Sequence, residues 1–262
     1  MHFPVRTSIT VYHNIRNNKW IRSFLTVCFW LAVWELLAIV IGKEVLFASP
    51  LSVFRKLCAL LKDVSFYRDI VNSLVNIIEG FFGALIVACM LSIFSLTVPA
   101  VYDVLSPFFS FVKATPVASF ILIAFLVFGS QRLSVFISFL MALPVLYGNL
   151  TDGLRSVPSK ELDAARVFNM RKTTRLRYIY LPAAVPYFLS GCTVSLGLSW
   201  KAGVAAEVIG LARFSLGERL YNAKLFLDTS EVFATTVVIV LMSWLTERLI
   251  VYFLKRLSSH IL

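Results

Sequence analysis

Long apolar stretches separated by short polar segments make up most of the chain. A helix needs about 20 mostly apolar residues to cross a bilayer, and six stretches approach or exceed that length: roughly Ile21–Ile41, Val71–Val98, Leu105–Gly129, Leu133–Leu150, Ala183–Trp200 and Val232–Phe253. The pattern predicts an all-α integral membrane protein with about six transmembrane helices. We expect residues 1–20 to form a tail and residues 21–262 a single transmembrane domain. The first stretch lacks a small-residue cleavage site and is interpreted as a retained helix, not as a signal peptide.

A shorter amphipathic element is expected between the first two spans. After Pro50, the apolar residues Phe54, Leu57, Leu61 and Val64 recur at helical spacing, which predicts a surface helix. Two interpretations stay open for it: a connecting helix packed on the other spans, or a surface that touches a delivery protein.

The largest polar segment, Glu161–Pro182, lies between the fourth and fifth spans. A short helix of about two or three turns is expected to begin near Pro158 and to end at Asn169, because asparagine tolerates the left-handed conformation that ends helices. Helices of this length are marginal in water, so we expect the segment to rest on a partner protein. The small side chains of Ala164 and Ala165 would allow that partner to approach closely.

The composition agrees with a membrane protein. Hydrophobic residues make up 59% of the 262 residues and the mean hydropathy is +0.83, whereas soluble domains are about 45–50% apolar. The net charge of +11 does not indicate nucleic-acid binding, since charged residues are only 15% of the chain and no basic stripe alternates with aromatic residues in a polar segment. The four cysteines have no metal-ligand spacing and are interpreted as small core residues: Cys28, Cys58, Cys89 and Cys192.

Basic residues indicate the orientation, because Lys and Arg accumulate in cytoplasmic segments. Before and at the start of the first span stand four basic residues and no acidic one: Arg6, Arg16, Lys19 and Arg22. We therefore expect both termini in the cytoplasm, together with the loop of about residues 151–182, which carries seven Lys or Arg between Arg155 and Arg177. The expected outer segments also carry basic residues, so the orientation rests on the N-terminus and this loop.

Ionisable residues at membrane depth are costly and therefore mark candidate functional positions. Lys113 lies in the third stretch beside Thr115 and Pro116, where a kinked helix could present a cation and free backbone groups to a translocation path. Lys201 and Glu207 lie at the outer end of the fifth stretch. These five residues are candidates for the pathway, and ion pairing or snorkelling of the lysines to the interface is the structural alternative.

Two further acidic residues and a run of small residues have structural interpretations. Glu35 and Glu79 are expected to pair with basic groups, and either could neutralise Lys113. The fifth stretch is rich in small residues that allow helices to approach closely, and lining of a pore stays open as a second role for them: Ser190, Gly191, Thr193, Ser195, Gly197, Ser199, Ala202, Gly203, Ala205 and Ala206.

Motifs for catalysis or nucleotide binding are missing from the sequence. The one Gly-Lys pair, Gly42-Lys43, lacks the upstream glycine of a phosphate-binding loop, so the chain is not expected to bind ATP by itself or to carry a cofactor. An integral membrane enzyme, such as a lipid-headgroup transferase with clustered aspartates, is the alternative from another class. The aspartates available for such a cluster are widely scattered: Asp103, Asp152, Asp163 and Asp228.

The spacing within the polar segment resembles a known signature. Asp163-Ala164-Ala165, three residues, Asn169, nine residues and Ile179-Tyr180-Leu181-Pro182 resemble the Glu-Ala-Ala signature of binding-protein-dependent ABC importer permeases, which has Glu and Gly at the positions of Asp163 and Asn169. Asp keeps the carboxylate, and Asn keeps access to positive φ. The resemblance extends to Lys113–Pro116, Trp200–Gly210 and Thr229–Ala234 and covers most of the chain after about residue 45. Within the family, the chain looks closest to the nitrate/sulfonate/taurine-type branch.

The resemblance implies a permease subunit that forms the translocation pathway of an ABC importer in the inner (cytoplasmic) membrane. A coupling helix between spans 4 and 5 would dock an ATPase through these residues: Glu161, Leu162, Asp163, Ala164, Ala165, Arg166 and Asn169. The implied partners are two ABC ATPase subunits that use the ATP, a second copy of the chain, and an extracytoplasmic solute-binding protein. The chain itself would not be an enzyme.

Two questions stay open from the sequence. A secondary transporter or channel without ATPases is the main alternative function, and the signature argues against it. The solute would be a small molecule, with anions and vitamin precursors both compatible with the branch that the chain resembles.

Overall fold

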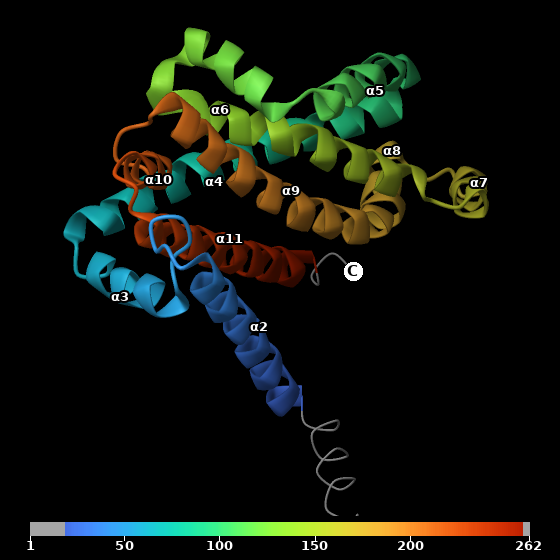
Figure 1. Ribbon diagram of the computed structural model, residues 1–262. Coiled ribbons are helices and arrows are strands. Elements are labelled where there is room, and N and C mark those ends of the chain that lie inside the picture. Colours follow the sequence, from blue (N-terminus) through green and yellow to red (C-terminus); the bar gives the residue numbers. More distant parts are fainter. Residues whose placement is uncertain (1–18, 259–262) are drawn as a thin grey trace, which may run out of the picture. The chain divides into compact units, whose positions relative to one another are not determined.

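The computed structural model describes residues 19–258, and all regular structure in this part of the chain is helical. The expected tail, residues 1–20, lies outside the described residues except for its last two. The helices, labelled as in Figure 1, are α2 (Lys19–Ile41), α3 (Pro50–Leu60), α4 (Val64–Thr97), α5 (Pro99–Ala114), α6 (Val117–Arg155), α7 (Ser159–Val167), α8 (Lys172–Arg175), the π-helical turn η1 (Leu176–Tyr180), α9 (Leu181–Gly210), α10 (Leu216–Leu225) and α11 (Thr229–Ser258).

Five helical segments of residues 19–258 are long and apolar enough to cross a membrane: Arg22–Ile41, Val64–Thr97, Val117–Arg155, Lys172–Gly210 and Thr229–Arg256. The all-α membrane class is therefore confirmed, but the expected count of six spans is not. The stretch Leu105–Gly129 is not one helix, because Thr115 takes the extended conformation that a following proline favours (φ −78°, ψ 134°) and separates α5 from α6. A second break lies at Gly129, whose φ of 65° and ψ of −176° are open essentially to glycine alone.

The chain divides into two compact units, which are described separately. The larger comprises Leu61–Asn222 and the residues from Thr235 onward, and its centre is formed by α4, α6 and α9, which pack along one another (Figure 1). Glycines allow the close approach. A Cβ at Gly80 would lie 2.4 Å from the backbone oxygen of Val135, and one at Gly203 would lie 2.5 Å from Ser138 Oγ. Gly197, in contrast, has open space where its Cβ would be, so its small size does not serve packing within the chain.

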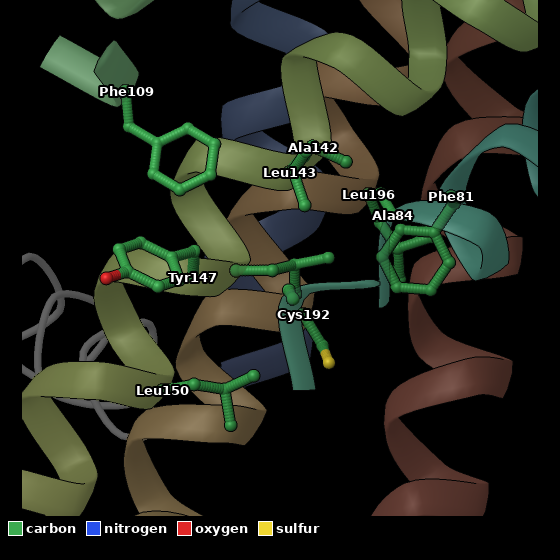
Figure 2. Close-up of a cluster of buried hydrophobic side chains, with 11 residues drawn as sticks. Phe81, Ala84, Phe109, Ala142, Leu143, Tyr147, Leu150, Cys192 and Leu196 are labelled. Atoms are coloured by element: carbon green, nitrogen blue, oxygen red, sulfur yellow. The ribbon is translucent and has the colours of Figure 1, made fainter. Parts of the chain in front are cut away.

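A buried apolar cluster joins α4, α5, α6 and α9 within this larger unit (Figure 2). The rings of Phe109 and Tyr147 lie 4.6 Å apart, and the Tyr147 hydroxyl lies 2.9 Å from Ser95 Oγ. In lipid such packing stabilises through dispersion contacts, since surrounding tails are as apolar as the side chains. Cys192 belongs to this cluster, as expected for a small core residue, whereas Cys28 and Cys58 are exposed.

The smaller unit comprises residues up to Leu60 together with Ala223–Ala234. In it, the Lys56 amine of α3 lies 2.6 Å from Asp228 and 2.8 Å from Glu231, at the start of α11. Burial lowers the pKa of Lys56, but the hydrogen bonds to both carboxylates outweigh it and raise this pKa above its ordinary value. The Phe233 ring packs between Trp34 and Phe47, with centroids 5.5 and 5.4 Å away.

The expected apolar face of the helix after Pro50 needs correction. Val53 and Leu60 are the buried residues of α3, and Phe54 is exposed. The helix ends at Leu60, because Asp63 caps α4 by accepting a hydrogen bond from the Ser65 amide.

Candidate functional site

The helix α7 has the start and the end that the sequence predicts. Pro158 precedes its first turn, and Asn169 follows it with a positive φ of 49°. The Asn169 amide donates to the Arg166 carbonyl at 3.0 Å, and the Met170 amide donates to the Ala165 carbonyl at 2.9 Å. These two bonds form the Schellman motif, which satisfies carbonyls at a helix end and favours Gly or Asn at the left-handed position.

The two alanines of α7 face different ways. Ala165 is 2% exposed, whereas Ala164 is exposed. Only Ala164 is therefore available for the expected close approach of a partner. The ion pair between Arg166 and Asp163, at 2.8 Å, lies on the exposed side together with Glu161, while Leu162 is half-buried.

Two large apolar side chains are exposed where α7 ends. Val167 and Phe168 are each 79% exposed, although the adjoining segment from Ser159 to Arg177 is rich in charge. Exposed apolar residues rimmed by polar ones are typical of protein contact surfaces. The sequence did not identify either residue as functional, because both lie among the three unspecified positions between Ala165 and Asn169 and neither side chain is ionisable or catalytic.

The candidate residues Lys113, Thr115 and Pro116 lie where α5 meets α6. The Lys113 amine reaches the backbone of α6 beside Gly148, 3.5 Å from where a Cβ of that glycine would be. Because Gly148 precedes the end of α6 by seven residues, Lys113 lies about 10 Å from that end. Lys113 also lines a cavity of about 160 Å³ together with Ser106, Ser110, Thr151 and Asp152. Glu79 does not neutralise it, since the Glu79 carboxylate pairs with Arg132 at 3.0 Å.

Lys201 lines a different cavity, between α9 and α11, of about 450 Å³. Its walls include the indole rings of Trp200 and Trp244 and the side chains of Thr236, Ser243 and Glu247. Glu247 was missed by sequence reasoning, although an ionisable residue inside the last apolar stretch is itself a signal of function. This cavity places a cation and an anion at the walls of one apolar space.

Glu207, the fifth candidate, is fully buried and hydrogen-bonded. Its carboxylate accepts from Ser73 Oγ of α4 at 2.7 Å, from Ser134 Oγ of α6 at 3.3 Å and from the Gly217 amide of α10 at 3.2 Å. Ser73 in turn accepts from the Leu216 amide at 2.9 Å. The structure thus joins four helices at Glu207, and this geometry favours a structural role. A part for Glu207 in the pathway stays a prediction.

Near the same end of the bundle, Arg219 of α10 forms ion pairs with acidic residues at the beginning of α4. Its guanidinium lies 2.8 Å from Asp69 and 3.4 Å from Asp63. Hydrogen bonds from Ser65 and the charge of Arg219 hold the pKa of Asp63 below its ordinary value. The sequence offers no signal for this link, because its partners are separated by about 150 positions and belong to different polar segments.

The structure does not bring the five pathway candidates together. Lys113 lies near the end of α6 that leads to α7, whereas Ser134, which binds Glu207, precedes Arg155 by 21 residues, or about 32 Å along the helix. Within the described part of the chain, no group of His, Cys, Asp or Glu side chains is placed to hold a metal ion.

Comparison with known families decides what this arrangement belongs to. Residues 80–259 match the family described as binding-protein-dependent transport system inner membrane component. The chain belongs to this family. Its expected place in the nitrate/taurine branch of ABC importer permeases is also confirmed by its relatives.

Curated relatives cover most of the permease. It is 27% identical over 248 residues to the nitrate import permease protein NrtB of Synechocystis sp., covering 91% of this chain and 89% of that one. It is 27% identical over 221 residues to the taurine transport system permease protein TauC of Escherichia coli, covering 82% and 80%. The fold matches a crystal structure of an amino acid ABC transporter with histidines, with a TM-score of 0.55 at 14% identity, over 72% of this chain and 91% of that one.

The permease is thus a multi-pass membrane subunit of an ABC importer. It forms the membrane path of a transporter whose other parts are ATPase subunits and a solute-binding protein. The helix α7 contains Asp163-Ala164-Ala165, the residues that resemble the Glu-Ala-Ala signature, and Asn169 after it has the left-handed backbone conformation that glycine adopts readily.

Proposed function

We propose that two copies of this permease form the pathway, that α7 of each copy docks one of two ATPase subunits, and that a binding protein delivers a small anion to the opposite face. ATP is bound and hydrolysed by the ATPases, the permease carries no cofactor, and no nucleic acid takes part. The pair resides in the inner membrane with the termini and α7 of each copy in the cytoplasm.

The surface of α7 carries this proposal. A charged helix with exposed Val167 and Phe168 beside exposed Ala164 offers a small apolar patch with a charged rim. A helix of nine residues gains little stability by itself in water, but the Schellman motif satisfies carbonyls at its end, and Ala165 is buried. Such a preformed element can enter a groove of a partner without first paying an ordering cost.

The distribution of paired charges supports a cytoplasmic α7. Of the seven basic residues from Arg155 to Arg177, Arg166 has an acidic partner within 4.0 Å in the described chain, namely Asp163. The polar segments at the start of α4 and in α10 are different, because Arg219 there is neutralised by Asp63 and Asp69. An excess of unpaired positive charge at the α7 end agrees with the rule that Lys and Arg accumulate in cytoplasmic loops.

The homodimer follows from counting docking elements. Each chain carries one α7, and two ATPases that close on each other need two such helices. Twofold symmetry is the commonest closed arrangement of identical subunits. Measuring the mass of the complex solubilised in mild detergent tests this part, and a second, different permease chain in the complex would reject it.

The anionic solute is supported by the names of the relatives and by Lys201. Nitrate, bicarbonate and taurine name the substrates of related permeases, and all three carry an anionic group. In this chain Lys201 lines a cavity of about 450 Å³ together with Glu247, so a solute there that carries an anionic group would face Lys201, and a cationic group such as the amine of taurine would face Glu247. Lys113 is the second candidate for positive potential along the path.

Docking is tested by replacing Ala164 with Trp. The bulky indole should prevent the ATPase from seating, so that the ATPase no longer co-purifies with the permease and ATP hydrolysis stimulated by the binding protein is lost. Ala118→Trp is the matched control, since Ala118 is also exposed but lies on α6. Normal assembly and hydrolysis by the Ala164→Trp complex would reject docking through α7.

The solute is tested with the assembled transporter in proteoliposomes. Lys201→Gln should lower uptake of labelled nitrate, bicarbonate or taurine per complex. Lys113→Gln should also lower this uptake if Lys113 is a second cationic position of the pathway, and should leave it unchanged if Lys113 is structural. If neither variant changes uptake of any anion that the parent transports, neither lysine serves the pathway.

A further inference from the structure

A cavity of about 350 Å³ lies between the end of α4 and the turn that leads into α9. From α4 it is lined by Ile93, Leu96 and Thr97, and from α8 and η1 by Lys172, Thr173, Arg175, Leu176 and Tyr180. All of these residues belong to the larger unit. The cavity is separate from the exposed face of α7 and from the cavities of Lys113 and Lys201, with which it shares no lining residue.

The polar part of this cavity is positively charged. Lys172 and Arg175 face no carboxylate within 4.0 Å among the residues that the structure describes. The hydroxyl of Thr173 adds a hydrogen-bond donor beside them. Two cations and a hydroxyl on one short turn suit a phosphate group, to which Arg can donate two parallel hydrogen bonds.

The rest of the cavity wall is apolar and continues onto a membrane-spanning helix. Ile93 is exposed on α4, and Leu96 and Leu176 are half-buried. Thr97 is the last residue of α4, so the cavity joins the end of an apolar helix to the charged turn that carries Lys172 and Arg175. Tyr180 suits such a boundary, because its ring is apolar and its hydroxyl is polar.

We propose that this cavity binds an anionic phospholipid, with the headgroup phosphate on Lys172 and Arg175 and the upper part of an acyl chain against Ile93, Leu96 and Leu176. The apolar wall distinguishes a lipid from a free phosphate ion, which would gain nothing from it. Basic pockets between helices on the cytoplasmic side are a general feature of anionic-lipid binding. The proposal uses the cytoplasmic placement of this turn given under Proposed function, but it does not rest on docking by α7 or on the identity of the solute.

A lipid in this position bridges two parts of the permease that the chain connects only indirectly. Its phosphate holds α8 and its chain lies on α4, so occupancy restrains the turn between α7 and α9. The π-helical η1 belongs to this turn, and π-helical turns are frequent at functional sites.

Native mass spectrometry of the full-length permease in detergent tests the proposal. Dioleoylphosphatidylglycerol should be retained in preference to dioleoylphosphatidylcholine at equal concentration. The double variant Lys172→Gln/Arg175→Gln should bind phosphatidylglycerol about 30-fold more weakly, which corresponds to about 1 kcal/mol for each basic residue. If this variant does not fold, the single variants, each expected to lose about fivefold, carry the same test.

The control variant Arg171→Gln/Arg177→Gln removes the same charge from the same segment without touching the cavity wall. It should change phosphatidylglycerol binding by less than about threefold, and an equal loss in both double variants would mean that only the general positive field acts. Leu96→Trp fills the apolar part and should also weaken lipid binding. Displacement of the lipid by millimolar inorganic phosphate, or loss of the lipid when the ATPases assemble, would overturn the proposal.

Discussion

Replacing Glu207 distinguishes a structural residue from a pathway residue. The carboxylate is fully buried and accepts hydrogen bonds from Ser73, Ser134 and the Gly217 amide. Glu207→Ala removes all three acceptor contacts and leaves the donors buried. Glu207→Gln keeps the shape and one carbonyl oxygen, so it disturbs the cluster less.

The expected magnitude follows from the number of donors left unpaired. Each buried donor without a partner costs about 1–3 kcal/mol, and the three donors that lose Glu207 are the hydroxyls of Ser73 and Ser134 and the Gly217 amide. We therefore expect Glu207→Ala to lower the free energy of unfolding by about 3–5 kcal/mol and Glu207→Gln by about 1–2 kcal/mol. At about 2–4 °C per kcal/mol for a chain of this size, the alanine variant should unfold about 10 °C lower.

The buried thiol of Cys192 provides the assay. In a background with the exposed Cys28 and Cys58 and the half-buried Cys89 replaced by Ser, a fluorogenic maleimide reports heating-induced exposure of the core, because Cys192 is 0% exposed in the folded chain. Asp163→Asn is the matched control. Its carboxylate pairs with Arg166 on the exposed side of α7, outside the membrane-spanning helices, and such exposed pairs contribute about 0–1 kcal/mol.

A pathway role for Glu207 would give a different result. In that case Glu207→Gln would unfold at the parental temperature and assemble with its ATPases but lose uptake of the solute per complex. That outcome would refute the structural assignment.

Three further predictions concern packing, a helix end and an ion pair. Gly80→Ala should lower the unfolding free energy by about 1–3 kcal/mol, since its Cβ would meet α6 backbone at 2.4 Å; Gly83→Ala, with its nearest neighbour at 3.5 Å, should be neutral in the same thermal assay. Asn169→Ala should speed hydrogen exchange of α7 amides about 5–30-fold, because a left-handed alanine costs about 1–2 kcal/mol, whereas Asn169→Gly should not. Burial raises the pKa of Asp228, but the hydrogen bonds from Lys56 and the Glu231 amide hold it below its ordinary value of 3.8; a folded pKa below the unfolded one contributes stability that is present above about pH 4 and lost as the pH falls through the folded value. Asp228→Asn, which can still cap α11, should therefore lose less unfolding free energy than the parent as the pH falls below 4. The difference should be less than about 1 kcal/mol, and an unchanged dependence of unfolding free energy on pH would show that the ion pair contributes nothing.

The sequence predicted the features that depend on local spacing. The apolar stretches gave the membrane class, and Pro158 and Asn169 marked the two ends of α7 because proline and left-handed asparagine have strong local preferences. The third apolar stretch was misjudged as one span. Hydropathy does not register a break at Thr115 and Pro116, since both halves stay apolar.

The roles of the ionisable residues depended on contacts that the sequence does not contain. Glu207 and Lys201 are six positions apart, yet one is enclosed by serines from two other helices and the other lines an open cavity. Ala164 and Ala165 are neighbours, but helix geometry turns one outward and the other inward. Burial of this kind is decided by tertiary packing.

The two ends of α7 are connected to their neighbours in different ways. Toward α6 the link is only three residues long, with Val157 buried and the Ser156 hydroxyl bonded to the Gly153 carbonyl at 2.8 Å. Toward α9 the chain passes through a left-handed residue, the short α8 and a π-helical turn before the long helix begins. If α7 docks an ATPase as proposed, a displacement of α7 reaches α6 through this short link and reaches α9 through the π-helical turn η1. The part of α6 from Arg155 to the break at Gly129 is about 39 Å long, and a bend at Gly129, where the backbone is already non-helical, would let α6 and α9 move by different amounts.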